Sequence, residues 1–130
     1  MNTERFSVIP GHWVIVRLGP EDPIPPWALS ATGFVSITRT PAELSIVCPT
    51  GLPPEGVQAE AGWSLIKLHG PFPFSHVGVL ASFVSPLAAA GISLFAISTF
   101  DTDYLLVKRT SAASACEALV RAGHTFVVEA

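Results

Sequence analysis

Two carboxylates separated by one residue stand out in a chain that carries few charges. Asp101 and Asp103 flank Thr102 directly after an apolar stretch. The spacing resembles a calcium-binding loop, but the strand-like residues that follow supply neither the glycine nor the distal glutamate of that motif. Two interpretations stay open. Either the acids bond local backbone amides in a hairpin turn, or one carboxylate at the hairpin tip faces a ligand.

Other sequence signatures of catalysis and of metal binding are absent. The chain has no GxSxG, no HExxH and no Gly-rich turn between a strand and a helix with an acid about 20 residues further on. No two of the four histidines stand close together: His12, His69, His76 and His124. We therefore predict no catalytic residue, no metal site and no cofactor. One enzymatic alternative pairs His76 with Asp101 as general acid and base.

Charge is scarce and unevenly distributed. Of 130 residues, 7 are Lys or Arg and 10 are Asp or Glu, so the net charge is −3 and the charged fraction is 13%, against about 25% in an average soluble domain. No charged residue occurs between Lys67 and Asp101. This gap is long enough for a transmembrane helix. However, Pro86 and Gly91 interrupt it and no basic cluster flanks it, so we predict no membrane span.

The sequence also limits the partners and the compartment. The seven basic residues are scattered, whereas nucleic acids are bound by basic stripes, so we predict no nucleic-acid partner. The first residues, MNTERFSVIPG, contain no apolar core of a secretory signal, and we expect a cytoplasmic protein. Cys48 and Cys116 form no CxxC pair and no disulfide framework, and we expect buried free thiols.

An interrupted helix occupies the middle of the uncharged gap. Apolar residues recur at helical spacing over residues 77–88, and Ser75 is the candidate N-cap. Pro86 has no backbone N–H to give to the carbonyl of Ser82, so the helix is expected to bend there. Gly91 is placed to end the helix. The gap therefore divides into a strand, a helix and a second strand.

Strand patterns and a second helix surround this first helix. A strand is expected before it, at residues 63–69, and a hairpin after it, with strands at residues 92–98 and 104–109. A second helix, capped by Thr110 or Ser111, then follows over residues 110–123, and a final strand over residues 124–129. This β-α-β-β-α-β order predicts an α+β, ferredoxin-like fold. Such a fold has a four-stranded antiparallel sheet with two helices on one face.

The first half of the chain reads as a shortened copy of the same unit. It contains three strand patterns, at residues 12–18, 33–39 and 43–48. Four prolines leave room only for a short helix near Trp27–Ala31, and the Pro/Gly-rich residues 49–62 are expected to be loop. The order of the elements supports the repeat, rather than residue identity. We therefore predict a shortened unit over residues 1–61 and a complete unit over residues 62–130.

The predicted topology brings two chemically distinct segments together. In a β-α-β-β unit, the start of the first helix and the end of the second strand lie at the same edge of the sheet. Residues 74–79 present helix N-terminal amides, Gly78 allows close approach, and the helix dipole favours an anion there. Asp101 lies in the turn at that edge and suits a cation. An anion site beside a carboxylate fits the two charged groups of an amino acid.

The second half resembles the ACT domain family, in particular small bacterial tandem ACT proteins and the related animal arginine sensors. The resemblance covers residues 63–129 through four blocks: Gly78-Val79-Leu80, Pro86-Leu87-Ala88, Ala90-Gly91-Ile92 and residues 97–103, ISTFDTD. Over residues 11–60 the similarity is looser and rests on strand order and a Pro/Gly-rich join. The resemblance implies an ACT domain over residues 62–130, preceded by a shortened ACT-like unit.

Members of this family bind free amino acids at interfaces between ACT units. The resemblance therefore implies a non-enzymatic regulatory or sensor protein, a small amino acid as ligand and a homodimer. The ligand-binding residues that it implies are Phe74, Ser75, His76, Val77, Gly78, Val79, Ser98, Thr99, Phe100, Asp101 and Thr102. The family often has Thr directly before the helix-start glycine, where this chain has Val77. The alternative is a protein–protein interaction or dimerisation module without a small-molecule ligand.

Overall fold

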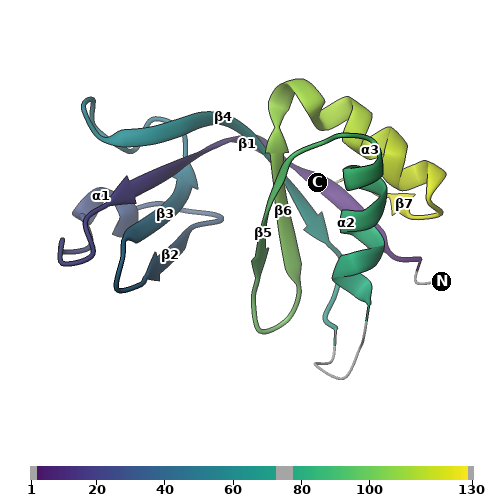
Figure 1. The fold of residues 1–130 in the computed structure, drawn as a ribbon, viewed down its shortest axis with the longest axis horizontal. Helices are drawn as coiled ribbons and strands as arrows, with labels where there is room; N and C mark the ends of the chain where they lie inside the picture. The colour runs from purple at the N-terminus through teal and green to yellow at the C-terminus, as the bar shows by residue number, and fades with distance from the viewer. Residues whose placement is uncertain (1–2, 73–77, 129–130) are drawn as a thin grey trace. The chain divides into compact units, whose positions relative to one another are not determined.

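A computed structural model describes residues 3–72 and 78–128 (Figure 1). None of the helices in these two stretches is long and apolar enough to cross a membrane. In chain order the elements are β1 (Arg5–Leu18), α1 (Pro26–Leu29), β2 (Ser36–Arg39), β3 (Leu44–Pro49), β4 (Gln58–Leu68), α2 (Val79–Ala89), β5 (Leu94–Ser98), β6 (Asp103–Lys108), a 3-10 turn (Arg109–Ser111), α3 (Ala112–Arg121) and β7 (Thr125–Phe126).

Two compact units share the long strands β1 and β4. Unit 1 comprises Met1–Pro10 with Ser64–Ala130, and unit 2 comprises Gly11–Trp63. The sequence predicts one boundary, after residue 61, with residues 1–10 in the first unit. The structure groups residues 1–10 with the second half of the chain, because the first part of β1 pairs with β7 and Phe6 lies in the core of unit 1. Strand β1 runs without a break through Pro10 and Gly11. The sequence pattern had suggested a strand only from residue 12.

Unit 1 has the β-α-β-β-α-β order that the sequence predicts, and this confirms the α+β, ferredoxin-like fold. Its strand order is β7-β1-β4-β6-β5, with β5 and β6 forming an antiparallel hairpin in which Ser98 is opposite Asp103. The first part of β1 adds a fifth strand, which runs parallel to β7 with Phe6 opposite Phe126. The final strand is shorter than predicted, since β7 has only two residues.

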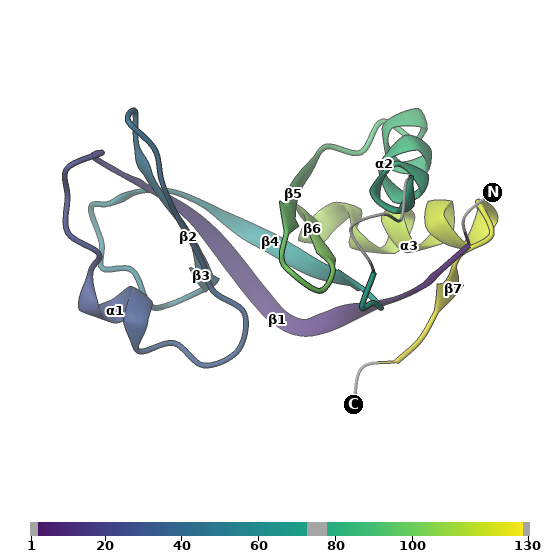
Figure 2. The same cartoon turned by 90° about the horizontal axis from the view of Figure 1, so that it is seen from below.

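The core of unit 1 lies between its strands and the two helices. Figure 2 shows α2 and α3 on the same side of these strands. Phe6 from β1 and Phe83 from α2 meet edge to face, with ring centroids 6.1 Å apart. Each fully buried leucine or phenylalanine contributes roughly 1.5–3 kcal/mol. The other large side chains of this core that are fully buried are Ile66, Leu68, Leu87, Leu105, Val107 and Leu119.

Helix α2 contains a proline and still continues through it. The helix starts after Gly78, which has a left-handed φ of 85°, and it includes Pro86. The predicted N-cap, Ser75, lies outside the described residues. The carbonyl of Ser82, which Pro86 leaves without its helical donor, accepts a hydrogen bond from Nε2 of His124 at 2.8 Å. Gly91, with a φ of 73°, follows the end of the helix as predicted.

Unit 2 is a small sheet with one short helix. Its strand order is β2-β3-β1-β4, and both pairs that β3 makes are antiparallel. Helix α1 has four residues and buries Ala28. The loop expected at residues 49–62 ends early, because β4 already begins at Gln58. The buried core residues are Val14, Val16, Ala28, Leu44, Ile46 and Cys48.

Candidate functional site

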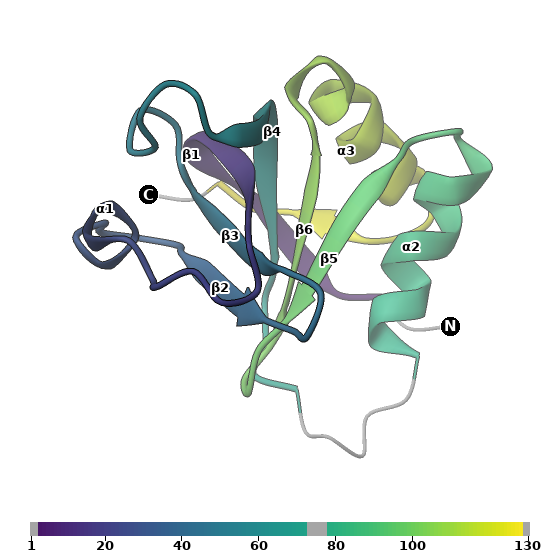
Figure 3. The ribbon, with the colours of Figure 1, turned by 60° about the vertical axis from the view of Figure 1, so that its left-hand side comes forward.

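The start of α2 and the turn between β5 and β6 lie at the same end of unit 1, as the predicted topology requires (Figures 1 and 3). A cavity of about 300 Å³ lies between them, and we call it the α2 cavity. Its lining comes from the segment before α2, the first turn of α2 and the β5–β6 turn: Phe72, Gly78, Val79, Leu80, Ala81 and residues 98–103.

The α2 side of this cavity is electropositive because of backbone geometry. The first N–H groups of a helix have no carbonyl acceptor within the helix, and the helix dipole adds partial positive charge at this end. No acidic residue occupies the first turn of α2. Gly78 starts the helix and its carbonyl accepts the N–H of Ser82 at 2.9 Å. This end of α2 therefore suits an anionic group.

Local hydrogen bonds close the turn on the opposite side of the cavity. The N–H and the hydroxyl of Thr99 both donate to the carbonyl of Thr102, at 2.8 and 3.1 Å. The hydroxyl of Ser98 donates to the Asp103 carboxylate. This hydrogen bond supports the interpretation of Asp103 as an acid that bonds within the hairpin. Asp103 is also one of the residues that line the cavity. Asp101 is exposed in the same turn.

Three contacts fix the turn against the end of β4. The hydroxyl of Thr102 is buried and donates to the carbonyl of Leu68 at 2.6 Å. The N–H of Phe72 donates to the carbonyl of Asp101 at 2.7 Å. Gly70 lies so close that a Cβ there would be 2.8 Å from the Asp101 carbonyl oxygen. The backbone that carries Asp101 is therefore held in place before any ligand arrives.

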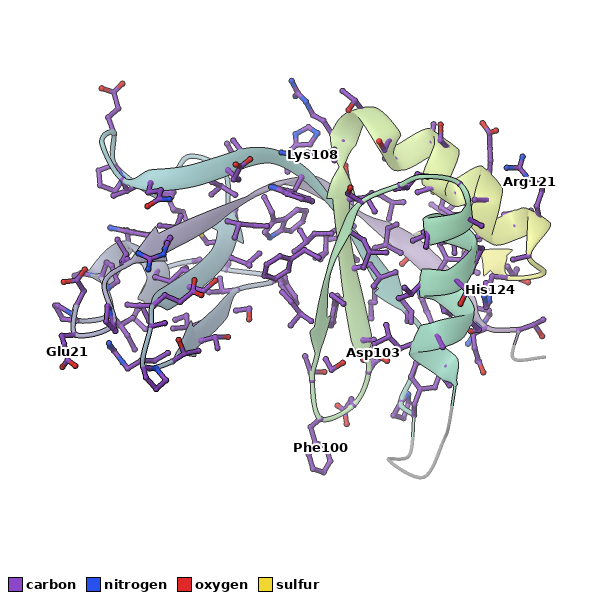
Figure 4. The ribbon with its side chains drawn as sticks, viewed as in Figure 1. Glu21, Phe100, Asp103, Lys108, Arg121 and His124 are labelled. Carbon is purple, nitrogen blue, oxygen red and sulfur yellow. The ribbon has the colours of Figure 1, made fainter. Side chains whose placement is uncertain are left out.

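The structure brings together seven of the eleven residues that the sequence analysis named. Gly78 and Val79 line the same cavity as residues 98–102, whereas Phe74, Ser75, His76 and Val77 lie outside the described residues. The predictions omitted Phe72, Leu80, Ala81 and Asp103. Strand alternation could have identified Asp103, because it pairs with Ser98 on the face that α2 covers. Figure 4 shows Asp103 extending towards α2, while Phe100 projects away from the tip of the hairpin.

Two histidines of the described residues have structural roles. His124 is 3% exposed and stacks on Phe83, with ring centroids 3.8 Å apart. His69 forms a hydrogen bond with the buried hydroxyl of Ser7, with 2.8 Å between Nε2 and Oγ. Among the described residues, no three His, Cys, Asp or Glu side chains are close enough to hold a metal ion.

A second, larger hollow of unit 1 has a different character. This groove of about 640 Å³ runs along α3 and is lined mainly by apolar side chains, including Val8, Cys116, Val120 and Phe126. Its lining is far less polar than that of the α2 cavity, so it suits an apolar partner better than an amino acid. Burial raises the pKa of the Cys116 thiol, and the same effect raises the pKa of Cys48 in unit 2.

Comparison with known proteins connects this geometry to a family. A family model described as an ACT domain matches residues 58–121, which include β4, α2, the β5–β6 hairpin and all of α3. This chain belongs to the ACT domain family. A second model, described as an N-terminal domain, matches residues 11–55. The ACT match thus contains the described part of the α2 cavity from Phe72 onward.

Two proteins more than 30% identical to this ACT protein are a human sensor and a bacterial protein of known structure. The human cytosolic arginine sensor for mTORC1 subunit 1 is 36% identical over 90 residues, which are 68% of this chain and 27% of that protein. This chain therefore matches about a quarter of that relative's length. A crystal structure of an Agobacterium tumefaciens protein is 41% identical, with a TM-score of 0.93 over 100% of this chain and 96% of the other.

The fold also occurs in the regulatory subunit of an enzyme. The ligand-free regulatory subunit of aspartate kinase from Thermus thermophilus is 15% identical, with a TM-score of 0.65 over 91% of this chain and 97% of the other. At that identity the likeness shows the fold alone. The family match and the human relative thus agree on an ACT domain in the second half of this chain.

Proposed function

We propose that this protein is a non-enzymatic sensor that binds a free amino acid in the α2 cavity. One observation carries the proposal: two acidic residues, Asp101 and Asp103, and the N-terminal end of α2 line the same cavity of about 300 Å³. The helix end binds the α-carboxylate, and the aspartates bind the ammonium group. Residues 74–77 belong to the proposed site through the family resemblance alone, because they lie outside the described residues.

The charge of the cavity narrows the class of ligand. Both acidic side chains of its described lining are aspartates, and that lining includes no Lys, Arg or His. Such a site favours a ligand with more positive than negative charge, because like charges at close range are unfavourable. The human relative is named as an arginine sensor. Arginine is therefore the first amino acid to test, followed by lysine and the neutral amino acids.

We also propose a cytoplasmic homodimer. Phe100 is 80% exposed at the rim of the α2 cavity. A large apolar side chain at the mouth of a cavity is well placed to be covered by a second ACT unit, with the ligand between the units. Light scattering of the purified protein measures the mass, and a monomer at every concentration, with and without arginine, would contradict the dimer.

Isothermal titration with each of the twenty amino acids tests the ligand. We expect at least one of them to give saturable heat. Asp103→Asn keeps the hydrogen bond from Ser98 but removes a charge, so it should weaken binding by about tenfold or more. Glu55→Gln, an exposed acid of unit 2, removes the same charge and should leave the affinity unchanged. No heat from any amino acid on the folded protein would overturn the proposal.

The apolar groove along α3 favours a second candidate function, an interaction module without a small-molecule ligand. Val120 and Phe126 of this groove are 50% and 44% exposed, which is unusual for such large apolar side chains. In that case the oligomeric mass would not respond to amino acids. Asp103→Asn would then behave like the parent protein in every assay, whereas Val120→Asp would abolish the association.

A further inference from the structure

The two charged residues that end the uncharged stretch of the sequence line one cavity. Lys67 and Asp101 are separated by 33 uncharged positions, yet both contribute to a hollow of about 300 Å³ in unit 1. We call it the Lys67 cavity. The remaining lining is supplied by the residues after β4, the β5–β6 turn and β6: Gly70, Pro71, Thr99, Thr102 and Tyr104.

Strand alternation places this cavity on the face away from the helices. Ile66 and Leu68 belong to the core beneath α2 and α3, so Lys67 between them projects from the other face of β4. Leu105 packs into the same core, which places Tyr104 on the same face as Lys67. Because β4 and β6 are neighbours in the sheet, the ammonium and the Tyr104 side chain can act on one bound molecule.

The backbone that carries the two charges is fixed. The carbonyl of Leu68, directly after Lys67, accepts the buried Thr102 hydroxyl at 2.6 Å. The carbonyl of Asp101 accepts the N–H of Phe72 at 2.7 Å. The position of Gly70 leaves no room for a Cβ against Asp101 and Thr102. A site on such a backbone loses little conformational freedom when a ligand binds.

Lys67 and Asp101, both in the described part of the chain, form no ion pair with one another, so neither charged group has to leave the other when a ligand binds. We infer that the Lys67 cavity is a second binding site, for a small zwitterion with an ammonium and a carboxylate a few atoms apart. Lys67 binds the carboxylate and Asp101 binds the ammonium. A volume of about 300 Å³ lies at the lower end of the range for ligand pockets, which suits a ligand of this size.

This site is separate from the proposed amino-acid site, although the two adjoin. Asp101 lines both cavities, but Lys67 and Tyr104 line only the second, and Ala81 and Asp103 line only the α2 cavity. A variant at Lys67 or Tyr104 therefore tests the Lys67 cavity alone, and a variant at Ala81 or Asp103 tests the α2 cavity alone. If both sites fill, they share a single carboxylate, so each ligand should weaken the binding of the other.

Amide chemical-shift mapping of the full chain tests the inference, with glycine, L-alanine and acetate as probes. Glycine and alanine should shift the signals of Gly70 and Tyr104, and acetate, which has no ammonium group, should bind about tenfold more weakly. Lys67→Met should weaken alanine binding at these signals by about tenfold or more. The matched control is Lys108→Met, which removes the same charge from the other lysine of the chain and should change affinity less than about twofold.

Three results would overturn the inference. Shifts confined to Gly78–Ala81 and unaffected by Lys67→Met would place the ligand in the α2 cavity alone, and the proposed function would survive. An equal loss of alanine affinity in Lys67→Met and Lys108→Met would show only a general effect of the protein's charge. No shift with either zwitterion at about 10 mM would mean that the site does not bind. If Lys67→Met fails to fold, the shift map of the parent protein decides.

Discussion

His124 replaces the hydrogen-bond donor that a proline removes from helix α2. Its Nε2 donates to the carbonyl of Ser82 at 2.8 Å, and this is the carbonyl that Pro86 cannot reach with an N–H. Its Nδ1 accepts the N–H of Glu4 at 3.1 Å. These two partners require the neutral ring with the proton on Nε2. One buried imidazole therefore joins α2 to Glu4, the residue directly before β1.

The joint role of His124 and Pro86 predicts energetic coupling between them. His124→Ala leaves the Ser82 carbonyl without a donor and removes the ring that stacks on Phe83, so it should cost about 2–4 kcal/mol. Pro86→Ala restores an N–H to the helix. In the Pro86→Ala background, the cost of His124→Ala should therefore fall by about 1 kcal/mol. Urea unfolding of the parent, both single variants and the double variant measures the coupling.

The cavity left by the missing ring is present in both backgrounds, so it cancels in this cycle. If the unfolding free energies lost in His124→Ala and Pro86→Ala add up in the double variant to within about 0.5 kcal/mol, the Ser82 carbonyl must find another donor when His124 is removed. A similar cycle between His124→Ala and Leu29→Ala, a change in unit 2, is the control and should show no coupling.

The close approach of Gly70 to the β5–β6 turn predicts a steric effect. A Cβ at this position would be 2.8 Å from the Asp101 carbonyl oxygen and 3.0 Å from Cβ of Thr102. Gly70→Ala should therefore destabilise the protein by about 1–3 kcal/mol and displace the turn. Thermal unfolding measures the loss, and backbone chemical shifts locate the displacement. Unchanged shifts at Asp101 and Thr102 would contradict the prediction.

Much of the fold of unit 1 was predictable because its signals are local. The helical spacing before Gly91, the two adjacent strand patterns and the polar turn between them need no knowledge of distant residues. Strand β1 shows the limit. Pro10 and Gly11 are common strand breakers, yet β1 continues through both because pairing with neighbouring strands outweighs local preference. The membership of residues 1–10 in unit 1 follows from that long-range pairing.

The candidate site was predictable in part for a similar reason. The helix start and the turn meet by topology, so Gly78 and Asp101 could be paired from element order alone. The contribution of Asp103 depends on which face of β6 it occupies, and that depends on strand register. The Lys67 cavity depends on a contact between residues 34 positions apart, Leu68 and Thr102. Sequence periodicity carries no information about such a contact.

Burial of the two thiols predicts a pH-dependent loss of stability. Desolvation raises the pKa of Cys48 and of Cys116 in the folded protein. The protonated thiols therefore favour the folded state, and this contribution is complete below the ordinary thiol pKa and is lost as pH rises through the raised value. The urea midpoint should fall between about pH 8 and about pH 10. A variant with alanine at both positions should lose less stability over the same interval.

The same burial predicts an order of modification by a thiol reagent. Cys48 is 0% exposed, whereas Cys116 is partly exposed in the groove along α3. At neutral pH both should react more slowly than a free thiol, because the thiolate is the reactive form and its fraction is reduced. Cys116 should react first, and Cys48 only at the rate of unfolding. Mass spectrometry after timed alkylation gives the order, and early modification of Cys48 would contradict it.

Phe100 at the hairpin tip is predicted to matter for binding and not for stability. Its side chain is 80% exposed and projects away from the hairpin (Figure 4), so Phe100→Ala should change the free energy of unfolding by less than about 0.5 kcal/mol. Phe100 is also among the residues that line the α2 cavity, and loss of its ring should weaken amino-acid binding by about tenfold. Leu29→Ala, 68% exposed in unit 2, is the matched control and should change neither quantity. Equal amino-acid affinities for Phe100→Ala and Leu29→Ala in the titration would exclude Phe100 from the site. A loss of free energy of unfolding in Phe100→Ala but not in Leu29→Ala would show that the ring packs against the protein.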